Sequence, residues 1–417
     1  MLNAKILINA TAVFTIVGVS SALVVTSDPA SAKYSVSAFA TGDWGTTLDK
    51  GSNSDVNAQD VVASIMDIQA GNADVKPKVV LGHGDSFYWN GINNPGERDS
   101  RFMATFDSEY NGANIKNVAW ANVMGNHDYG GADYICNSGD KLVSCNSTEE
   151  LFRGLDNKLK WQAEYKSPNN GRWMMKDHFY VHRIEDTESG VSIDVFNVDT
   201  NDADVHGVSL VCCQCYGYAK ADSGGCGTIA RGDKYCCGGD NALYDACMNK
   251  FTEWGDDSRA QLAEKVASST ATWKIVNSHY SPYEHYLEPG MNKWFDVLRN
   301  SGVRAFLYGH THGEKHDYSP SLGIHFVENG AGGGARKEAA SSIPSYATKY
   351  VKNEWTYTPN EYGFFSVEAS KDWLKLQYHT TDDNWGFTEK YENTTVGGVA
   401  TKHCWYIPAD GSEGKAC

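Results

Sequence analysis

Short apolar runs recur along the chain from its beginning to about residue 310. The runs SVSAFAT, KVVLGH, VAWANVM, WKIVNS and VRAFLY are rich in β-branched and other apolar residues, which is typical of buried strands. Between the first two runs, the apolar residues of Asp55–Ala70 are spaced by three, four and seven positions, which predicts an amphipathic helix. Strands that alternate with helices predict a layered α/β fold.

A polar motif closes or follows each of these apolar runs. The motifs, in chain order, are GDWG at Gly42–Gly45, GDSFY at Gly84–Tyr88, GNHD at Gly125–Asp128, NSHY at Asn277–Tyr280 and GHTH at Gly309–His312. Each motif alone is a weak signal, because such turns and histidine pairs are common on surfaces and in cores. Ligand crevices of α/β sheets form at the carboxyl ends of strands, so five such motifs together predict one shared site.

The side chains of these motifs are a mixture of hard oxygen donors and imidazoles. The candidate metal ligands are Asp43, Asp85, Tyr88, Asn126, His279, His310 and His312. This donor set suits iron, manganese or zinc, and it is large enough for two ions held close together. Paired metal ions activate water and neutralise phosphate charge, so the pattern indicates hydrolysis of phosphate esters without a serine or cysteine nucleophile.

At this level of detail the chain resembles the calcineurin-like metallophosphoesterases, and within them the small purple acid phosphatases, also called tartrate-resistant acid phosphatases. Tyr88, three places after Asp85, is the residue that indicates the purple acid phosphatase subgroup. Similar stretches extend the likeness over roughly Tyr34 to Tyr391. These stretches are Phe179–Ile184, Val195–Thr200, Glu328–Gly334 and Tyr362–Ala369. The resemblance implies a four-layer αββα sandwich with a dinuclear metal site at the carboxyl ends of the strands.

The resemblance also implies a division of the seven ligands between two ions. Asp43, Tyr88 and His312 would hold ferric iron, while Asn126, His279 and His310 would hold a divalent ion (iron, zinc or manganese), with Asp85 bridging both. Donor chemistry agrees, because phenolate and carboxylate favour a trivalent ion and neutral donors suit a divalent one. Hydroxide held by the metals would then attack the phosphate ester.

Two histidines are candidates for the catalytic acid. His127 directly follows Asn126, so it is expected beside the metals, either as a proton donor or as a residue that orients a ligand. The related animal enzymes have a histidine nine places after the position of His279, where this chain has Glu288. His285, six places on, is the candidate replacement, and a solvated loop histidine is the alternative reading.

The chain is predicted to have one catalytic domain, 33–392, between a signal peptide, 1–32, and a terminal tail, 393–417. Lys5, the apolar run Ile6–Val25 and the small residues Ala30–Ala32 are typical of a cleaved export signal, with a membrane anchor as the alternative. The motifs extend from Asp43 to His312, so a simple boundary within this range would separate them.

The cysteines agree with an exported protein. All eleven follow residue 32, and seven of them lie within Cys212–Cys247, in an insertion of about 205–247. We expect disulfides there, with a structural zinc site as the rival because Cys212 and Cys215 form a CxxC. The pairs Cys136 with Cys145 and Cys404 with Cys417 are plausible by nearness, which leaves one odd thiol. The disulfides of the insertion either stabilise a long surface loop, or the insertion helps to select the substrate.

The charge and the sequons limit the partners. A net charge of −16 with no basic run disfavours nucleic acid and anionic membranes, so small phosphate esters or phosphorylated side chains are the expected substrates. Asn146 and Asn393 lie in glycosylation sequons. The sequence thus predicts a secreted acid phosphatase that hydrolyses monoesters at mildly acid pH. The alternatives are a phosphodiesterase or nucleotide pyrophosphatase of the same superfamily, and a catalytically silent secreted binding protein.

Overall fold

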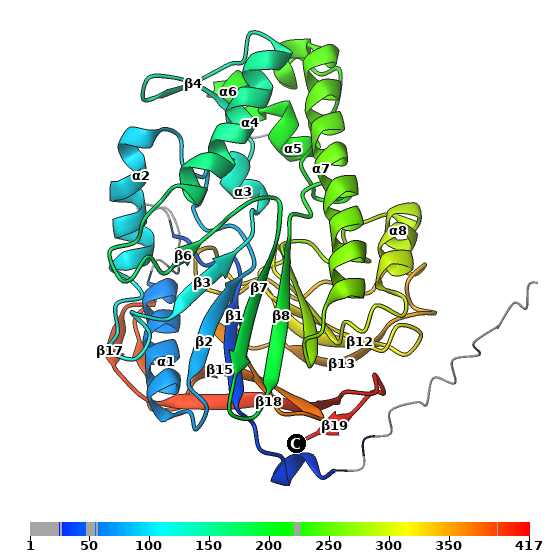
Figure 1. Ribbon diagram of the computed structural model, residues 1–417. Helices are drawn as coiled ribbons and strands as arrows, with labels where there is room; N and C mark the ends of the chain where they lie inside the picture. The colour runs from blue at the N-terminus through cyan, green and yellow to red at the C-terminus, as the bar shows by residue number, and fades with distance from the viewer. Residues whose placement is uncertain (1–24, 26, 47–54, 56, 221–225, 390) are drawn as a thin grey trace, which may run out of the picture.

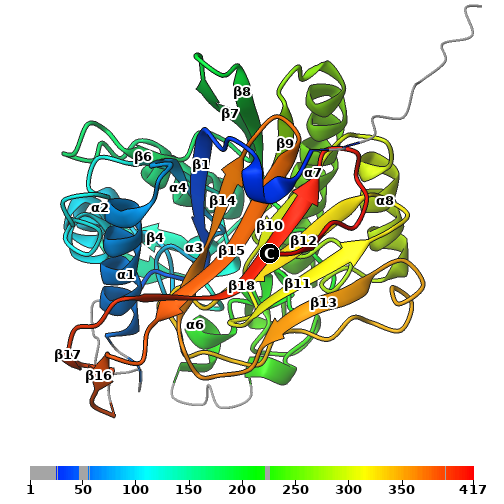
Figure 2. The ribbon, with the colours of Figure 1, turned by 90° about the horizontal axis from the view of Figure 1, so that it is seen from below.

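Two mixed β-sheets pack against each other and carry helices on their outer faces (Figures 1 and 2). The computed structural model describes residues 25, 27–46, 55, 57–220, 226–389 and 391–417. Most of the predicted signal peptide, 1–32, lies outside the described residues. In the part of the chain that is described, no helix combines the length and the apolar character needed to cross a membrane.

The first sheet has eight strands in the order β19-β18-β15-β14-β1-β2-β3-β6. Its parallel part is β1 (Val36–Thr41), β2 (Pro77–Gly82), β3 (Ala119–Asn122) and β6 (Trp173–Met174). Its antiparallel part is β14 (Gly363–Ala369), β15 (Trp373–Thr381), β18 (Val399–Pro408) and β19 (Lys415–Ala416). Three of the five apolar runs of the sequence form its parallel strands.

The second sheet has seven strands in the order β13-β11-β12-β10-β9-β8-β7. The strands β8 (Val191–Val198), β9 (Trp273–Ser278), β10 (Ala305–Tyr308) and β12 (Ile324–Asn329) are parallel. The strands β7 (Phe179–Asp186), β11 (Glu314–Ser319) and β13 (Lys352–Tyr357) complete it in antiparallel pairings. The other two apolar runs of the sequence are β9 and β10.

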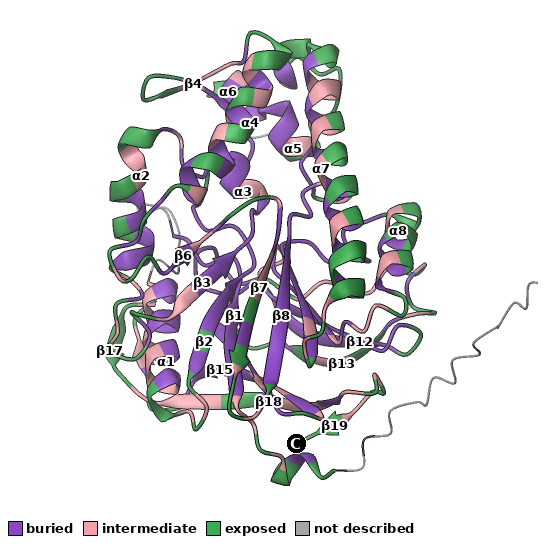
Figure 3. Cartoon of the chain, in the orientation of Figure 1, coloured by how far each residue is buried: buried purple, intermediate pink, exposed green. Residues whose placement is uncertain are grey.

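Side chains alternate between two apolar layers along each inner strand. In β10, Leu307 packs between the sheets whereas Phe306 packs on the outer face, and in β2 Leu81 and Val80 divide in the same way. Because neighbouring residues of a strand point to opposite faces, each sheet needs a cover on its outer side. Figure 3 shows the strands mainly buried and the helices with exposed outer faces. The predicted four-layer αββα sandwich is confirmed.

The helices cover the two outer faces and gather at one end of the molecule. They are α1 (Ala58–Asn72), α2 (Pro95–Phe102), which continues into a π-helical turn (Met103–Asp107), α3 (Asn126–Tyr129), α4 (Thr148–Ala163), α5 (Ser209–Cys213), α6 (Cys215–Ala219), α7 (Asn241–Ser268) and α8 (Glu288–Leu298). In Figure 1, α4, α5 and α6 lie at the end opposite to the C-terminus. Helix α1 matches the helix predicted from the spacing in Asp55–Ala70.

Four small elements complete the described structure. Two short hairpins pair β4 (Cys136–Ser138) with β5 (Lys141–Val143) and β16 (Gly386–Phe387) with β17 (Asn393–Thr395). Two 3₁₀ turns cover Pro29–Ser31 and Cys237–Gly239.

The segment 393–417 differs from the expected terminal tail. Its strand β18 pairs with β15 over the length of both strands, from Trp373 opposite Pro408 to Thr381 opposite Val399. Lys402, Thr401 and the other polar residues of β18 hide the alternation that marks a strand, because this strand lies near the edge of the sheet and is partly exposed. The part of the segment from Val399 to Ala416 therefore belongs to the sandwich.

Five disulfides form among the eleven cysteines. They are Cys136–Cys145, Cys404–Cys417, Cys212–Cys247, Cys213–Cys236 and Cys215–Cys226, and Cys237 remains a buried free thiol. The two pairs expected from nearness are confirmed, as is the single odd thiol. Both cysteines of the CxxC are in disulfides, so the rival zinc site is wrong.

Candidate metal centre

The five polar motifs leave their strands on tight turns at one edge of the sandwich. Asp43 follows β1, Asp85 follows β2 and His310 follows β10, and all three have positive φ angles of 54°, 50° and 69°. Residues other than glycine seldom adopt this conformation, and a strained backbone is found mainly where a function requires it. Three of the predicted metal ligands are therefore held in unusual backbone conformations.

Two glycines allow the turns that contain them to lie directly against a carboxylate of another motif. A β-carbon on Gly125 would lie 2.2 Å from Oδ1 of Asp85, and one on Gly309 would lie 2.3 Å from Oδ2 of Asp43. Real β-carbons do not come so close to other heavy atoms, so a side chain at either position would displace a carboxylate. The glycines of GNHD and GHTH are thus required by the packing around Asp85 and Asp43.

One group of donor atoms is formed by Asn126, His279 and His310. The Oδ1 atom of Asn126 lies 3.0 Å from Nε2 of His279 and 3.1 Å from Nδ1 of His310, and the two ring nitrogens are 3.3 Å apart. Oδ1 of Asp85 lies 3.6 Å from Nε2 of His279. The ligand atoms of Asp85, His279 and His310 all lie within 4.8 Å of one another, which is the spacing of a metal site.

A second group of donor atoms is formed by Asp43, Tyr88 and His312. The Tyr88 hydroxyl donates to Oδ1 of Asp43 over 2.9 Å and lies 3.1 Å from Nε2 of His312. Oδ1 of Asp43 lies 3.7 Å from that same nitrogen. The side chain of Asp85 also interacts with those of Asp43 and Tyr88. The structure therefore brings together all seven side chains predicted from the sequence, in the two groups that the resemblance implied, with Asp85 beside both.

The donor atoms of the first group fit a cation. Nδ1 of His279 donates to the main-chain oxygen of His83 over 2.7 Å, so Nε2 of His279 carries a lone pair. This lone pair and the carbonyl oxygen of Asn126 are both hydrogen-bond acceptors, although they lie 3.0 Å apart. Two acceptors at this distance repel each other unless a positive charge lies next to both, which is what a metal ion provides.

The charges of the second group fit a cation as well. Asp43 and Tyr88 are buried, and burial together with the Asp85 carboxylate raises the pKa of Asp43 well above its usual value. Burial and the charges of Asp43 and Asp85 likewise raise the pKa of the Tyr88 hydroxyl. Clustered buried anions are unfavourable on their own, and a multivalent cation removes this penalty.

The two candidate catalytic histidines both line a cavity of about 620 Å³ that also contains Asp85, Asn126 and His310. Nδ1 of His127 donates to the main-chain oxygen of Trp89 over 2.9 Å, so this hydrogen bond does not engage the other ring nitrogen, Nε2. The main-chain N–H of His127 donates to Oδ1 of Asp85 over 2.9 Å. His127 therefore lies directly beside the predicted ligands.

His285 is buried, and it lies against the ring of His310 with centroids 4.9 Å apart. Its Nδ1 accepts the main-chain N–H of Ser281 over 3.1 Å, so its proton is on Nε2, which lies 3.4 Å from the Thr311 hydroxyl oxygen. Burial, with smaller contributions from His279 and His206, lowers the pKa of His285 to about 3. His285 is thus a neutral imidazole in the cavity wall and not a solvated loop residue.

Two residues that shape the site were not among the predicted site residues. Oδ2 of the buried Asp128 accepts the main-chain N–H of Gly125 over 2.8 Å, and its Oδ1 accepts that of Ser86 over 3.1 Å, which ties two motif turns together. His206 is exposed on the cavity wall, and its ring centroid lies 6.5 Å from that of His310. The aspartate of GNHD was a visible signal, whereas His206 had none.

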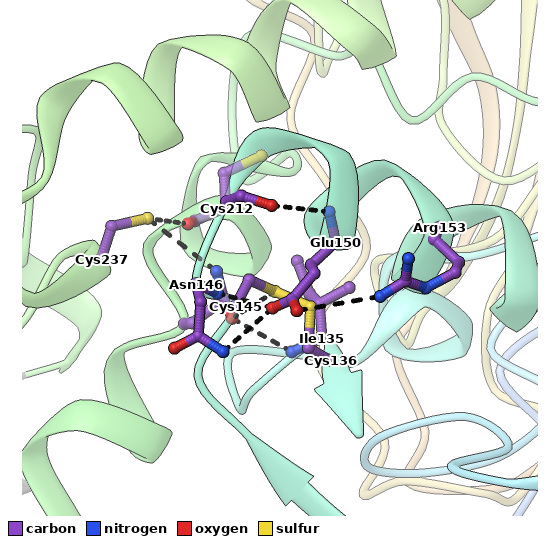
Figure 4. The surroundings of a disulfide bond; sticks show 10 residues. Ile135, Cys136, Cys145, Asn146, Glu150, Arg153, Cys212 and Cys237 are labelled. Atoms are coloured by element: carbon purple, nitrogen blue, oxygen red, sulfur yellow. Dashed lines mark hydrogen bonds and ion pairs between the residues drawn. A yellow bond between two sulfur atoms is a disulfide. The ribbon is translucent and has the colours of Figure 1, made fainter. Parts of the chain in front are cut away.

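The two predicted glycosylation sites are exposed. Asn146 immediately precedes the N-cap residue Ser147 of α4, and its side chain donates to Glu150 over 3.0 Å (Figure 4). Asn393 begins β17. Both side chains are accessible to a modifying enzyme. Glycosylation itself stays a prediction.

Comparison with known sequences identifies the family. The model of the calcineurin-like phosphoesterase family matches residues 38–314, which is more than half of the chain. Purple acid phosphatase 17 of Arabidopsis thaliana is 26% identical over 310 residues, 73% of this chain and 70% of that protein. Tartrate-resistant acid phosphatase type 5 of Oryctolagus cuniculus is 23% identical over 260 residues, 61% of this chain and 60% of that enzyme, so less than two thirds of its length is matched. The human enzyme of the same name is 22% identical over 355 residues, 81% of this chain and 85% of that protein.

Solved structures agree on the fold alone. The structure described as GAP50, the anchor in the inner membrane complex of Plasmodium, has a TM-score of 0.50 at 14% identity, with 89% of this chain and 91% of that chain covered. PhoD has a TM-score of 0.50 at 10% identity, with 92% and 72% covered. The family and its purple acid phosphatase relatives imply a dinuclear metal centre and hydrolysis of phosphate esters. On the evidence of the matched region and the motifs within it, this chain belongs to the calcineurin-like phosphoesterase family.

Proposed function

We propose that the chain is an acid phosphatase that hydrolyses phosphate monoesters at a pair of metal ions. One observation carries the proposal: two groups of donor atoms, with Asp85 beside both, meet at the wall of one cavity that also contains His127. The names of the curated relatives support the monoester reading, since they are acid phosphatases.

The proposed ligands of a ferric ion are Asp43, Tyr88 and His312, and those of a divalent ion (iron, zinc or manganese) are Asn126, His279 and His310. Asp85 is the proposed bridge between them. The anionic oxygen donors of the first set suit a trivalent ion, and the neutral donors of the second set suit a divalent one. When bound, such a pair of ions supplies Lewis acidity, which makes water more acidic and neutralises the charge of the phosphate ester.

In this proposal His127 supplies the proton that the leaving alcohol needs. The Trp89 carbonyl oxygen holds Nδ1 of His127 as the donor, so Nε2 is the atom that carries the transferable proton. His285 has a different role, because burial keeps its ring neutral at mildly acid pH. Its Nε2–H is the proposed hydrogen-bond donor to a phosphate oxygen, in a site where donors orient the ester and stabilise developing charge.

We also propose that the protein is exported. Five disulfides, which persist mainly in oxidising compartments, support this proposal together with the composition of residues 1–32. Asn146 and Asn393 are the proposed glycosylation sites. A shift in the mass of the protein after enzymatic deglycosylation, lost in Asn146→Gln and Asn393→Gln, would test them.

The proposed activity is tested by comparing p-nitrophenyl phosphate with bis(p-nitrophenyl) phosphate from about pH 4 to about pH 9. We expect faster hydrolysis of the monoester and an optimum below pH 7, because ferric iron makes bound water strongly acidic. A preference for the diester would support a phosphodiesterase. An optimum above about pH 8 would contradict the ferric assignment, and retained metal with no turnover of either ester would indicate a binding protein.

A further inference from the structure

A polar hollow of about 200 Å³ lies beside Asn146, one of the two predicted glycosylation sites. Helix α4 and the β4–β5 hairpin form its wall, and it shares no residue with the cavity of the metal centre. The polar members of the wall are Asn137, Ser138, Asn146, Glu150, Arg153 and Asn157. The hollow is smaller than the usual pocket for a cofactor, and its size suits a single sugar ring.

The backbone of Asn146 is fixed on both sides. Cys145, which directly precedes it, is joined to Cys136 of β4 by a disulfide. Ser147, which directly follows it, is the N-cap residue of α4, and its hydroxyl accepts the main-chain N–H of Glu150 over 3.2 Å. A group attached to Asn146 is therefore held in a defined place before it makes any further contact.

The side chain of Asn146 is oriented as well (Figure 4). Its Nδ2 donates to Oε2 of Glu150 over 3.0 Å, and its main-chain N–H donates to the same oxygen over 2.9 Å. Nδ2 carries two hydrogens, and an attached sugar replaces only one of them, so the other keeps the bond to Glu150. Because Glu150 itself lines the hollow, the first ring of the glycan begins at its wall.

Two further side chains of α4 offer hydrogen-bonding groups to this ring. Arg153 and Asn157 follow Glu150 at spacings of three and four residues, so all three lie on one face of the helix. Among the described residues, the Arg153 side chain has one ionic partner, Glu150 at 3.9 Å, and the Asn157 side chain forms no hydrogen bond. The hydroxyl and acetamido groups of a sugar suit such donors and acceptors.

We propose that this hollow receives the first sugar, an N-acetylglucosamine ring, of a glycan attached to Asn146. The inference rests on the proposed export and glycosylation, and it is independent of the phosphatase activity. The glycan is transferred from its lipid diphosphate carrier, which leaves as the diphosphate while Nδ2 of Asn146 loses one proton. The bound ring joins the β4–β5 hairpin to α4, at the end of the molecule where α5 and α6 also lie (Figure 1).

The second sequon provides a comparison within the same chain. Asn393 begins β17, and all three residues of this strand are exposed. An enzyme that removes glycans from asparagine must reach the bond between the amide and the first sugar. A ring that is bound in a hollow is therefore released more slowly than a ring on an open strand.

Release of the two glycans from the folded protein tests the inference. We would express the chain in a eukaryotic secretory host, treat the native protein with peptide-N-glycosidase F and follow each site by mass spectrometry, since this enzyme leaves aspartate in place of asparagine. We expect release at Asn146 to be at least about tenfold slower than at Asn393, a factor that one or two hydrogen bonds supply. After denaturation the two rates should become similar.

Variants of the wall separate a bound sugar from simple crowding. A double variant, Arg153→Ala with Asn157→Ala, should accelerate release at Asn146 about three- to tenfold and leave release at Asn393 unchanged. Asp156→Ala is the matched control, because Asp156 is exposed on the same helix but does not line this hollow. This control should release both glycans at the wild-type rates.

The outcomes separate this inference from the proposed function. Equal release of the two glycans from the folded wild-type protein would overturn the sugar site, as would an unchanged rate at Asn146 in the double variant. An unmodified Asn146 would contradict both the sugar site and the proposed glycosylation at that residue. The hydrolysis of phosphate esters is measured separately, so the phosphatase function stands in each of these cases.

Discussion

Nδ1 of His279 donates to the main-chain oxygen of His83 over 2.7 Å, so the ring of His279 presents its Nε2 lone pair to Asn126 and Asp85. The side chain of His83 is in turn fixed by Asn277, with Nδ1 of His83 2.6 Å from Oδ1 of Asn277. Asn277 also donates to the oxygens of Gly82 and Ala121 over 3.2 Å, so strands β2, β3 and β9 hold this arrangement. A ligand that is oriented by its second nitrogen in this way is typical of metal-binding histidines.

Replacement of His279 should remove metal from one of the two positions. His279→Ala deletes a donor of the proposed divalent site, so we expect the metal content to fall by about one ion per chain and the activity to fall at least about a hundredfold. Elemental analysis and initial-rate measurements check this. His182→Ala, on the edge strand β7, is the control and should retain both. Full metal content in His279→Ala would contradict the proposed ligand set.

Replacement of His127 should affect chemistry and not metal. We expect His127→Ala to lower kcat by about 10² to 10⁴, the usual contribution of a general acid. The loss should be largest for alkyl phosphates and smallest for p-nitrophenyl phosphate, whose leaving group scarcely needs a proton. Steady-state rates for a series of leaving groups check this. An equal loss for all esters would assign His127 to the orientation of ligands instead.

Acid should destabilise the protein through three buried histidines that are not among the predicted metal ligands. His316 lies 3.0 Å from His403 and 2.8 Å from His325 through their ring nitrogens. Burial lowers the pKa of His403 to about 4 and that of His325 to about 3, and burial also lowers the pKa of His316. Below about pH 6.5 the unfolded chain therefore takes up protons that the folded chain does not, so stability falls as the pH falls.

The size of this effect is tested with His403→Gln. Each such histidine contributes at most about 1.4 kcal/mol per pH unit between its unfolded and folded pKa values. Urea denaturation at several pH values should give a free energy of unfolding that depends less steeply on pH in His403→Gln than in the wild-type protein. An unchanged or steeper slope between about pH 6.5 and about pH 4 would contradict the prediction.

One thiol per chain should react only after denaturation. Sγ of Cys237 is buried and lies 2.9 Å from the main-chain oxygen of Cys212 (Figure 4), and burial raises its pKa to about 11. A thiol with this pKa has little thiolate at neutral pH and reacts slowly. Titration with a thiol reagent should give about none per folded chain and one in denaturant, and Cys237→Ser should give none in either state. Two or more thiols in the denatured wild-type protein would contradict the five disulfides.

The strands and the ligands were predictable because local sequence encodes both. Each apolar run before a motif forms a strand, and the motif follows at its carboxyl end, so Asp43, Asp85 and His310 meet as expected. Strand β18 was missed because its polar residues leave no clear alternation. Burial of the whole β14–β15–β18 region is decided by pairing between distant segments, which the sequence of one segment does not reveal.

The cysteine-rich insertion was the least predictable part of the site. Seven cysteines allow many connectivities, and the position of His206 in the wall of the metal-centre cavity depends on which ones pair. In the structure Cys212–Cys247 ties α5 to α7, and His206 and Leu210 of the insertion line the cavity of the metal centre. The role in substrate selection left open by the sequence can now be tested at His206 and Leu210, which line that cavity.

The most direct test of the account is the metal content and visible absorption spectrum of the purified protein and of Tyr88→Phe. We expect about two metal ions per chain, one of them iron, and a visible band in the wild-type protein that arises from the Tyr88 phenolate on ferric iron. Tyr88→Phe should lose that band. A protein that binds fewer than about one metal ion per chain after reconstitution would contradict the proposal that seven side chains hold a metal pair.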